Sequence, residues 1–239
     1  MNTDTIDIAG LPVEVVRKRI ANLHVGVYPP DGRVRVAAPI ALSDDAVRMA
    51  VLTRFPWIKK QQLSFLSQER ETPRAYVSGE THYVFGSPYR LVVVEVPGNR
   101  HDFELTADKR IKMIAPQGST ASQRARWMQE WCRKTLKEKA QPRVQKWADD
   151  LHLPLPKCGI KKMKTKWGSC NPEKGLIWLN IDLAKKPIAC LEYVILHEMA
   201  HFVSPKHDDA FVAVLDRFMP RWRQVRSDLN ALPLSAFET

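Results

Sequence analysis

The chain lacks the features that mark membrane proteins, exported proteins and disulfide-stabilised proteins. Its 239 residues contain no uninterrupted apolar run of about 18 residues, so we expect no transmembrane helix. The N-terminus begins polar and acidic and has no apolar segment typical of a signal peptide, so we expect a cytoplasmic protein. The four cysteines form no C-x-x-C pair, which argues against a zinc ribbon and predicts free thiols.

Acidic residues are fewer than basic ones, and the imbalance lies mainly in the second half. The chain has 37 Lys and Arg against 26 Asp and Glu, a net charge of +11. From residue 121 onward there are 21 basic and 13 acidic residues, or +8. Such an excess can attract nucleic acid, although a solvated basic surface is its commoner meaning. A weak association of this half with nucleic acid is therefore a hypothesis.

Strand patterns dominate the first half. Residues 13–39 alternate apolar and polar positions around P-P-D-G at 29–32, which predicts a β-hairpin. Residues 43–71 read as helical, with Ser43 as N-cap and Pro56 kinking or dividing the segment. Residues 75–115 are rich in β-branched and aromatic residues and end in another predicted hairpin. We find no internal repeat in the sequence.

The second half alternates helical and strand patterns. Residues 122–150 predict a helix in which Pro142 starts a new turn or causes a kink. Two short strands are predicted within residues 158–183, and helices from Pro187 to the end. The turn-like link at 116–122 is the best internal boundary. We therefore predict an α+β protein with a mainly β region, residues 1–118, and a catalytic region, residues 119–239, packed as one compact unit.

A short motif near the C-terminus carries the strongest functional signal. Residues 195–201 read I-L-H-E-M-A-H inside a helix predicted from about residue 187 to 203. His197 and His201 are four residues apart and therefore share one helix face, with Glu198 beside them. Ionisable groups are costly among apolar neighbours unless partners satisfy them. One metal ion with its water meets most of that need, so we interpret the motif as a metal site rather than a pair of structural histidines.

A catalytic zinc ion usually has a third protein ligand and one open position. His207 follows a turn that contains Pro205, and this turn would let the chain fold back toward the metal. The rival third ligands are acidic and lie near the same helix: Glu192, Asp208 and Asp209. Zinc would lower the pKa of a bound water, and Glu198 would take its proton as general base. The predicted reaction is hydrolysis of a peptide bond.

Several motifs around this site resemble those of the YgjP-like zinc metallopeptidase family, which is related to the SprT-like proteases. The shared motifs are W-G-S-C at Trp167 to Cys170, Gly175, I-x-L-N at Ile177 to Asn180, Pro187, the segment Tyr193 to His201, and His207. The segments D-G-R-V-R-V-A-A-P and Y-V-S-G-E-T-H-Y-V-F-G-S-P-Y-R-L extend the resemblance over most of the chain. Two departures from the family pattern, Asp208 and Met199, affect no proposed ligand.

The resemblance implies a zincin-like fold, in which a small antiparallel or mixed sheet packs on the H-E-x-x-H helix. It also implies one zinc ion per chain, bound by His197, His201 and His207, and a catalytic role for Glu198. The polypeptide substrate is implied in the same way. Two alternatives stay open: a DNA-associated protease of SprT type, and a non-enzymatic module in which zinc only stabilises the fold.

The segment K-T-K-W-G-S-C has two interpretations. It is either an edge strand that pairs with an extended peptide substrate, or a structural strand in which Trp167 packs in the core and Gly168 permits a tight backbone. We interpret Cys170 as a small buried residue rather than a ligand or nucleophile. The densest basic patch comprises Lys157, Lys161, Lys162, Lys164 and Lys166.

Overall fold

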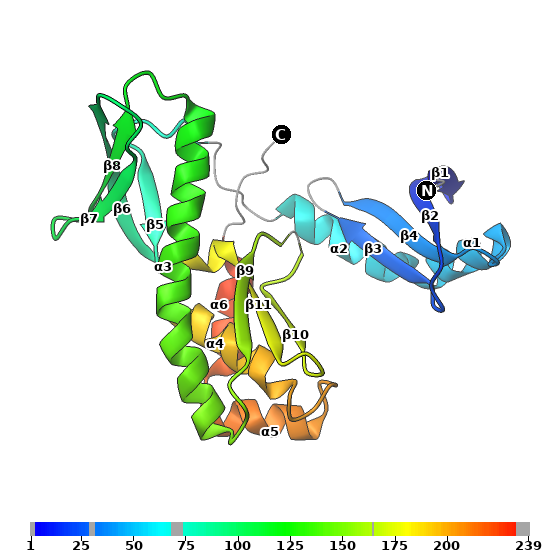
Figure 1. Ribbon diagram of the computed structural model, residues 1–239. Coiled ribbons are helices and arrows are strands. Elements are labelled where there is room, and N and C mark those ends of the chain that lie inside the picture. The colour runs from blue at the N-terminus through cyan, green and yellow to red at the C-terminus, as the bar shows by residue number, and fades with distance from the viewer. Residues whose placement is uncertain (1–2, 29–31, 68–73, 164, 233–239) are drawn as a thin grey trace. The chain divides into compact units, whose positions relative to one another are not determined.

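The computed structural model describes residues 3–28, 32–67, 74–163 and 165–232 of the chain (Figure 1). These residues form two compact units, one within residues 1–71 and one within residues 72–235. Both units combine helices with small mixed sheets, so the α+β class is confirmed. No helix in the described ranges has both the length and the apolar character needed to cross a membrane.

The first unit is a four-stranded sheet with two helices. Its strands are β1 (Thr3–Ile8), β2 (Leu11–Lys18), β3 (His24–Tyr28) and β4 (Arg33–Pro39), in the order β1-β2-β4-β3. β3 and β4 pair antiparallel, which confirms the first hairpin for residues 24–39, whereas residues 13–18 of the predicted range belong to the separate strand β2, parallel to β4. Pro29, Pro30 and Asp31 of the predicted turn lie outside the described residues. The helices are α1 (Asp44–Thr53) and α2 (Phe55–Ser67), divided just before Pro56 as predicted, and Ser43 caps α1.

The second unit begins with a sheet of the same topology. Its strands are β5 (Thr81–Val84), β6 (Ser87–Val96), β7 (Asp102–Leu105) and β8 (Arg110–Pro116), in the order β5-β6-β8-β7. In both sheets an antiparallel, a parallel and an antiparallel pairing follow one another. A helix with a side-chain N-cap, Ser43 or Thr120, follows each sheet.

The two sheets thus repeat one strand topology, although we find no internal repeat in the sequence. The last strands in chain order, R-V-R-V-A-A-P and R-I-K-M-I-A-P, have identical burial patterns and both end in Ala-Pro. Different apolar residues fill the equivalent buried positions, Val34 and Val36 in β4 and Ile111 and Met113 in β8. Burial constrains polarity and size at these positions rather than identity, so the repeat is clear in the strand pairing and faint in the sequence.

The 30-residue helix α3 (Ala121–Asp150) joins two hydrophobic clusters of the second unit (Figure 1). It begins with a capping box formed by Thr120 and Gln123, and it continues through Pro142 without a new start. Trp127 and Met128 pack with the β5–β8 sheet, whereas the later residues Leu136, Ala140, Val144 and Trp147 belong to the cluster around the C-terminal elements. The division at residues 118 and 119 stays a prediction about domains.

Three strands, rather than the two predicted, precede the C-terminal helices. They are β9 (Lys157–Lys161), β10 (Gly168–Asn171) and β11 (Leu176–Asn180), in the order β10-β11-β9. The buried Asn180 separates the first two because its side-chain amide donates to the carbonyl groups of Met163 and Lys166, at 3.0 and 2.9 Å. These bonds hold a loop where the sequence pattern suggested a continuous strand. A short 3₁₀ helix, η1 (Ile181–Lys185), follows β11.

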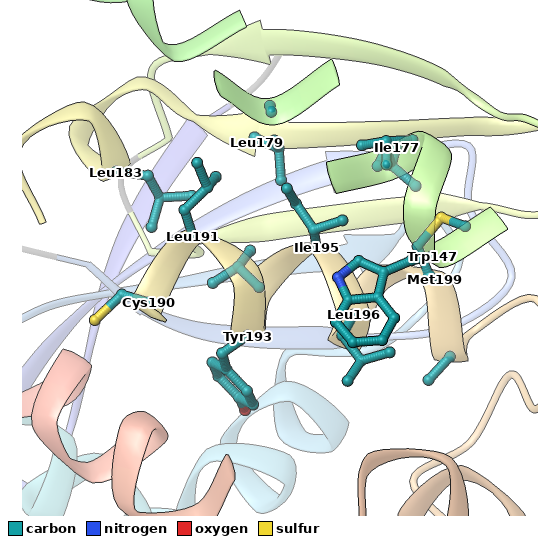
Figure 2. Packing of buried hydrophobic residues seen from close by; sticks show 14 of the residues in the cluster. Trp147, Ile177, Leu179, Leu183, Cys190, Leu191, Tyr193, Ile195, Leu196 and Met199 are labelled. Atoms are coloured by element: carbon teal, nitrogen blue, oxygen red, sulfur yellow. The ribbon is translucent and has the colours of Figure 1, made fainter. Parts of the chain in front are cut away.

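Helix α4 (Ile188–Ala200) lies in the core of the second unit and contacts α3, β10 and β11, as well as α5 (Asp209–Phe218) and α6 (Trp222–Ala231). Leu191 and Ile195 are fully buried and point from α4 toward Leu179 and Leu183 (Figure 2). Burying each of these side chains stabilises the fold by roughly 2 kcal/mol. α4 therefore provides a rigid base for the polar residues at its C-terminal end.

Candidate active site

The three histidines of the predicted metal site lie close together. His197 lies in the last turn of α4, His201 is its C-cap, and His207 lies in the loop before α5. One ring nitrogen of each lies within 4.8 Å of those of the other two. The Nε2 atoms of His197 and His207 are 3.3 Å apart. The turn at residues 201–208 therefore returns the chain to the end of α4, as expected from Pro205.

Neighbouring groups orient two of these rings. The Nδ1 atom of His201 lies 3.3 Å from the carbonyl oxygen of Ser204, and Nδ1 of His197 lies 3.5 Å from the hydroxyl of Tyr193, one helical turn earlier. When Nδ1 of an imidazole is engaged, Nε2 is left as the ligand atom. In both histidines, Nε2 is thus the atom available to a shared ion.

Burial keeps the two helix histidines uncharged. The pKa of His197 is lowered to about 4, mainly by burial and in smaller degree by the nearby His201, His207 and Arg226. Burial is also the main reason that the pKa of His201 lies below its usual value. Both rings are therefore neutral at physiological pH, which is the form that binds metal ions.

Glu198 lies beside the histidines and is buried, with only 6% of its surface exposed. Burial raises the pKa of its carboxyl to about 7, while the positive charge of Lys166 opposes that rise. Gly168, the first residue of β10, lies directly against it. A Cβ atom on this glycine would stand 2.5 Å from Oε1 of Glu198, far inside van der Waals contact. Glu198 and β10 thus approach each other closely because residue 168 has no side chain.

These residues line one pocket of about 470 Å³ in the second unit. Its walls come from β10 with the residues before it, the C-terminal half of α4, the loop that carries His207, and α6. Besides the histidines and Glu198, the lining includes Lys166, Trp167, Ser169, Cys170, Tyr193, Pro205, Arg226 and Asn230. The candidate metal ligands are therefore accessible to a molecule that enters this pocket.

The three acidic residues considered as the third ligand are paired with other groups or lie outside the histidine cluster. Glu192 pairs with Arg143, with Oε1 and Nε 3.1 Å apart. Asp208 caps α5 by accepting a hydrogen bond from the backbone N–H of Phe211, and it accepts another from the Ser204 hydroxyl. Asp209 lies exposed in the first turn of α5. Within the described residues, no Asp or Glu joins the cluster of three histidines.

The segment before β11 combines parts of both interpretations. β10 is an edge strand, as the functional interpretation expects, and Trp167 packs against the core, as the structural one expects. Cys170, predicted to be a small buried residue, is partly buried and lines the pocket. Burial, with a smaller contribution from Glu198, raises the pKa of its thiol to about 12. The thiol is therefore protonated at neutral pH and a poor ligand or nucleophile.

Three residues of the site were not predicted from the sequence. Tyr193 stands four residues before His197, so helical spacing alone could have suggested their contact. Ser204 and Arg226 gave no such signal. Ser204 acts through its backbone carbonyl, and Arg226 reaches the pocket from α6, which only tertiary packing brings close.

The imidazoles of His197, His201 and His207 converge from the two ends of one turn, and burial holds the first two neutral. Their donor chemistry fits a divalent transition metal such as zinc. Such a centre beside a buried glutamate in an accessible pocket defines the class of metal-dependent peptidases. A model of the YgjP-like metallopeptidase domain matches residues 23–232, and the chain belongs to this family.

Other comparisons add little to this family assignment. No curated protein sequence matches the chain. Two solved structures are similar to part of it, the metallopeptidase zymogens abylysin of Pyrococcus abyssi and jannalysin of Methanocaldococcus jannaschii. They share 19% and 23% identity, and each match covers 38% of this chain and 90% or 92% of the other. With TM-scores of 0.36 and 0.35, these likenesses carry no structural argument.

Proposed function

We propose that this protein is a zinc-dependent peptidase of zincin-like fold that binds one zinc ion per chain through His197, His201 and His207. Glu198 acts as its general base. The observation that carries the proposal is the convergence of the three ring nitrogens within 4.8 Å, next to a buried glutamate in an accessible pocket. Membership of the YgjP-like metallopeptidase family supports it independently.

The protein groups divide the work of hydrolysis. A zinc ion held by the histidines would polarise the scissile carbonyl and lower the pKa of a water molecule. Glu198, with a pKa raised to about 7 by burial, accepts the proton of the attacking water and passes it to the leaving amine. Tyr193 and the Ser204 carbonyl keep the ligand rings oriented.

The edge strand β10 supports a polypeptide substrate. In the described part of the chain β10 pairs only with β11, so its other edge is open, and its residues Gly168 to Cys170 line the pocket. An extended peptide can add to such an edge through main-chain hydrogen bonds. The substrate would then pass directly in front of Glu198, which lies against Gly168.

Replacement of the proposed base tests the mechanism. In Glu198→Gln we expect peptide hydrolysis to fall by about 10²-fold or more, because proton transfer is lost. The zinc content should stay near one per chain, because the histidines are unchanged. Metal analysis of purified protein and cleavage of a mixed peptide library measure the two effects.

Glu192→Gln is the matched control, since Glu192 lies on the same helix and pairs with Arg143 away from the site. It should retain hydrolysis and zinc. Purified wild-type protein without stoichiometric zinc would refute the metal site. Stoichiometric zinc without hydrolysis of any peptide would favour the alternative of a structural zinc module, which the accessible pocket and the buried glutamate argue against.

The association with nucleic acid, as in a protease of SprT type, stays a prediction from the basic second half. No comparison bears on it. The cytoplasmic location likewise stays a prediction. A binding assay with duplex DNA at increasing salt tests the association, because phosphate contacts make affinity fall steeply with salt. An absence of binding at low salt would remove it.

A further inference from the structure

The pocket carries an excess of positive charge that the proposed catalytic mechanism does not use. Two cationic side chains, Lys166 and Arg226, line it, and Glu198 is the sole carboxylate among the described lining residues. A bound divalent metal would add to this excess. Positive charge concentrated in a cleft attracts an anionic group of the ligand.

Lys166 lies at the β10 side of the pocket. Its backbone carbonyl accepts a hydrogen bond of 2.9 Å from the buried Asn180, which anchors the loop directly before β10. Its side chain lines the same pocket as Glu198 and His201. Lys166 is thus held beside the residues that carry out the reaction.

Arg226 reaches the pocket from a different element, α6. The buried residues Trp222 and Leu229 anchor this helix, and the ring of Trp222 stacks on Tyr193 at a centroid distance of 6.2 Å. Arg226 is exposed and lines the same pocket as His197. Arg226 therefore reaches the pocket from an element that lies about 60 residues after Lys166 in the chain.

Neither cation is neutralised within the described chain. Arg223, three residues before Arg226 on the same helix, pairs with Asp216 at 2.6 Å, and Arg143 pairs with Glu192 on α4. Neither Arg226 nor Lys166 forms an ion pair with any residue that the structure describes. Each residue alone could be an ordinary solvated cation on the surface. That interpretation does not explain why two unpaired cations from separate elements line the same pocket.

We infer that Arg226 and Lys166 select substrates that present a carboxylate next to the scissile peptide bond. This inference rests on the proposed peptidase function. A guanidinium forms paired hydrogen bonds to a carboxylate, whereas an ammonium contributes a point charge, so Arg226 is the binding group and Lys166 strengthens its field. The carboxylate is either that of an Asp or Glu side chain or that of the peptide C-terminus.

Matched peptides test the inference and distinguish the two sources. A peptide that the wild-type protein cleaves is made with Glu or Gln at each position flanking the cleaved bond, and with a free or amidated C-terminus. We expect kcat/KM to be about tenfold higher with the carboxylate present, as for one charge-assisted hydrogen bond. The preference should fall toward unity in Arg226→Ala and partly in Lys166→Ala.

The controls are Arg221→Ala and Lys174→Ala, exposed cations outside the pocket lining, which should leave the preference unchanged. If kcat/KM falls when Glu is exchanged for Gln, the recognised carboxylate is that of a side chain. If kcat/KM falls when the C-terminus is amidated, it is the C-terminal carboxylate. Equal kcat/KM for charged and neutral peptides, or a preference that survives in both pocket variants, overturns the inference.

A binding arm separates this inference from the proposed function. Zinc-loaded Glu198→Gln protein is titrated calorimetrically with the same peptide pairs, with and without Arg226→Ala in the same background. We expect the carboxylate peptide to bind about tenfold more tightly than its neutral partner, and this difference to vanish without Arg226. If no peptide is hydrolysed by wild type, the peptidase proposal fails, whereas equal binding of both peptides overturns the carboxylate inference alone.

Discussion

At the scale of single residues, Gly168 determines how closely β10 approaches Glu198. Its added Cβ would lie 2.5 Å from Oε1 and 2.7 Å from Cγ of Glu198, so any side chain at this position would displace the carboxylate. The sequence suggested that Gly168 permits a tight backbone. The close neighbour is instead the side chain of the proposed general base, so this glycine of the W-G-S-C motif matters for chemistry as well as for packing.

We therefore expect Gly168→Ala to reduce peptide hydrolysis by about 10²-fold through misplacement of Glu198, without loss of bound zinc. The control is Gly26→Ala, where a new Cβ would meet the ring of Tyr28 at 2.7 Å in the first unit. Activity and zinc content of both variants are compared with wild type. Full activity of Gly168→Ala would show that the position of Glu198 does not depend on this glycine.

The candidate metal ligands were predictable because local spacing defines most of them. His197 and His201 lie four residues apart on one helix, so helical geometry alone predicts their common face, with Glu198 beside them. His207 was predictable from the turn at Pro205, although the sequence left acidic rivals open. Arg226 was not predictable, because its position depends on how α6 packs against Tyr193 through Trp222.

At the scale of elements, the loop between α4 and α5 holds two of the proposed ligands. Ser204 is buried in this loop, and its carbonyl oxygen lies 3.3 Å from Nδ1 of His201. Its hydroxyl donates a hydrogen bond of 2.8 Å to the carboxylate of Asp208. Asp208 in turn caps α5 through the N–H of Phe211. The helix cap and His201 therefore belong to one hydrogen-bonded structure, and His207 directly precedes the capping residue Asp208 in the chain.

Asp208→Ala should weaken zinc binding as well as the helix. Loss of the N-cap should lower the melting temperature by a few degrees, and the looser His207 should lower zinc affinity about tenfold. Asp208→Asn should retain both properties, because asparagine also caps helices well. Thermal denaturation and competition with a zinc chelator measure the effects. Unchanged affinity in Asp208→Ala would show that the cap does not support His207.

The elements were predicted well where periodicity is regular and less well where side chains interrupt it. The hairpin of β3 and β4 and the helix around H-E-x-x-H follow from alternation and helical spacing. The break between β9 and β10 does not, because it depends on hydrogen bonds from the distant Asn180 to Met163 and Lys166. Such long-range polar contacts leave no periodic signal.

At the scale of the whole molecule, the boundary of the catalytic part is the main question that the sequence left open. The predicted boundary at residues 118 and 119 would separate the β5–β8 sheet from α3. Trp127 and Met128 of α3 are buried against this sheet, and the N–H groups of Phe85 and Gly86 donate to carbonyl groups of η1. A compact unit that begins at residue 72 keeps all these contacts together.

We expect a fragment of residues 72–239 to fold and bind zinc as the full chain does. A fragment of residues 119–239 should be much less stable, because it exposes Trp127 and Met128 and loses the bonds to η1. Circular dichroism, thermal melting and zinc content of the two purified fragments provide the comparison. Equal stability of both fragments would support the boundary at 118 and 119 instead.

The length of α3 has a consequence for how the second unit responds to change. A helix of 30 residues is about 45 Å long. The first turns of α3 pack against the β5–β8 sheet, and its later turns pack on α4. Helix formation is cooperative, so one end is not easily melted while the other persists. A substitution in the sheet that displaces the start of α3 can thus also shift its later turns and the helix α4 that carries His197. Substitutions far from the pocket can therefore change the geometry of the site.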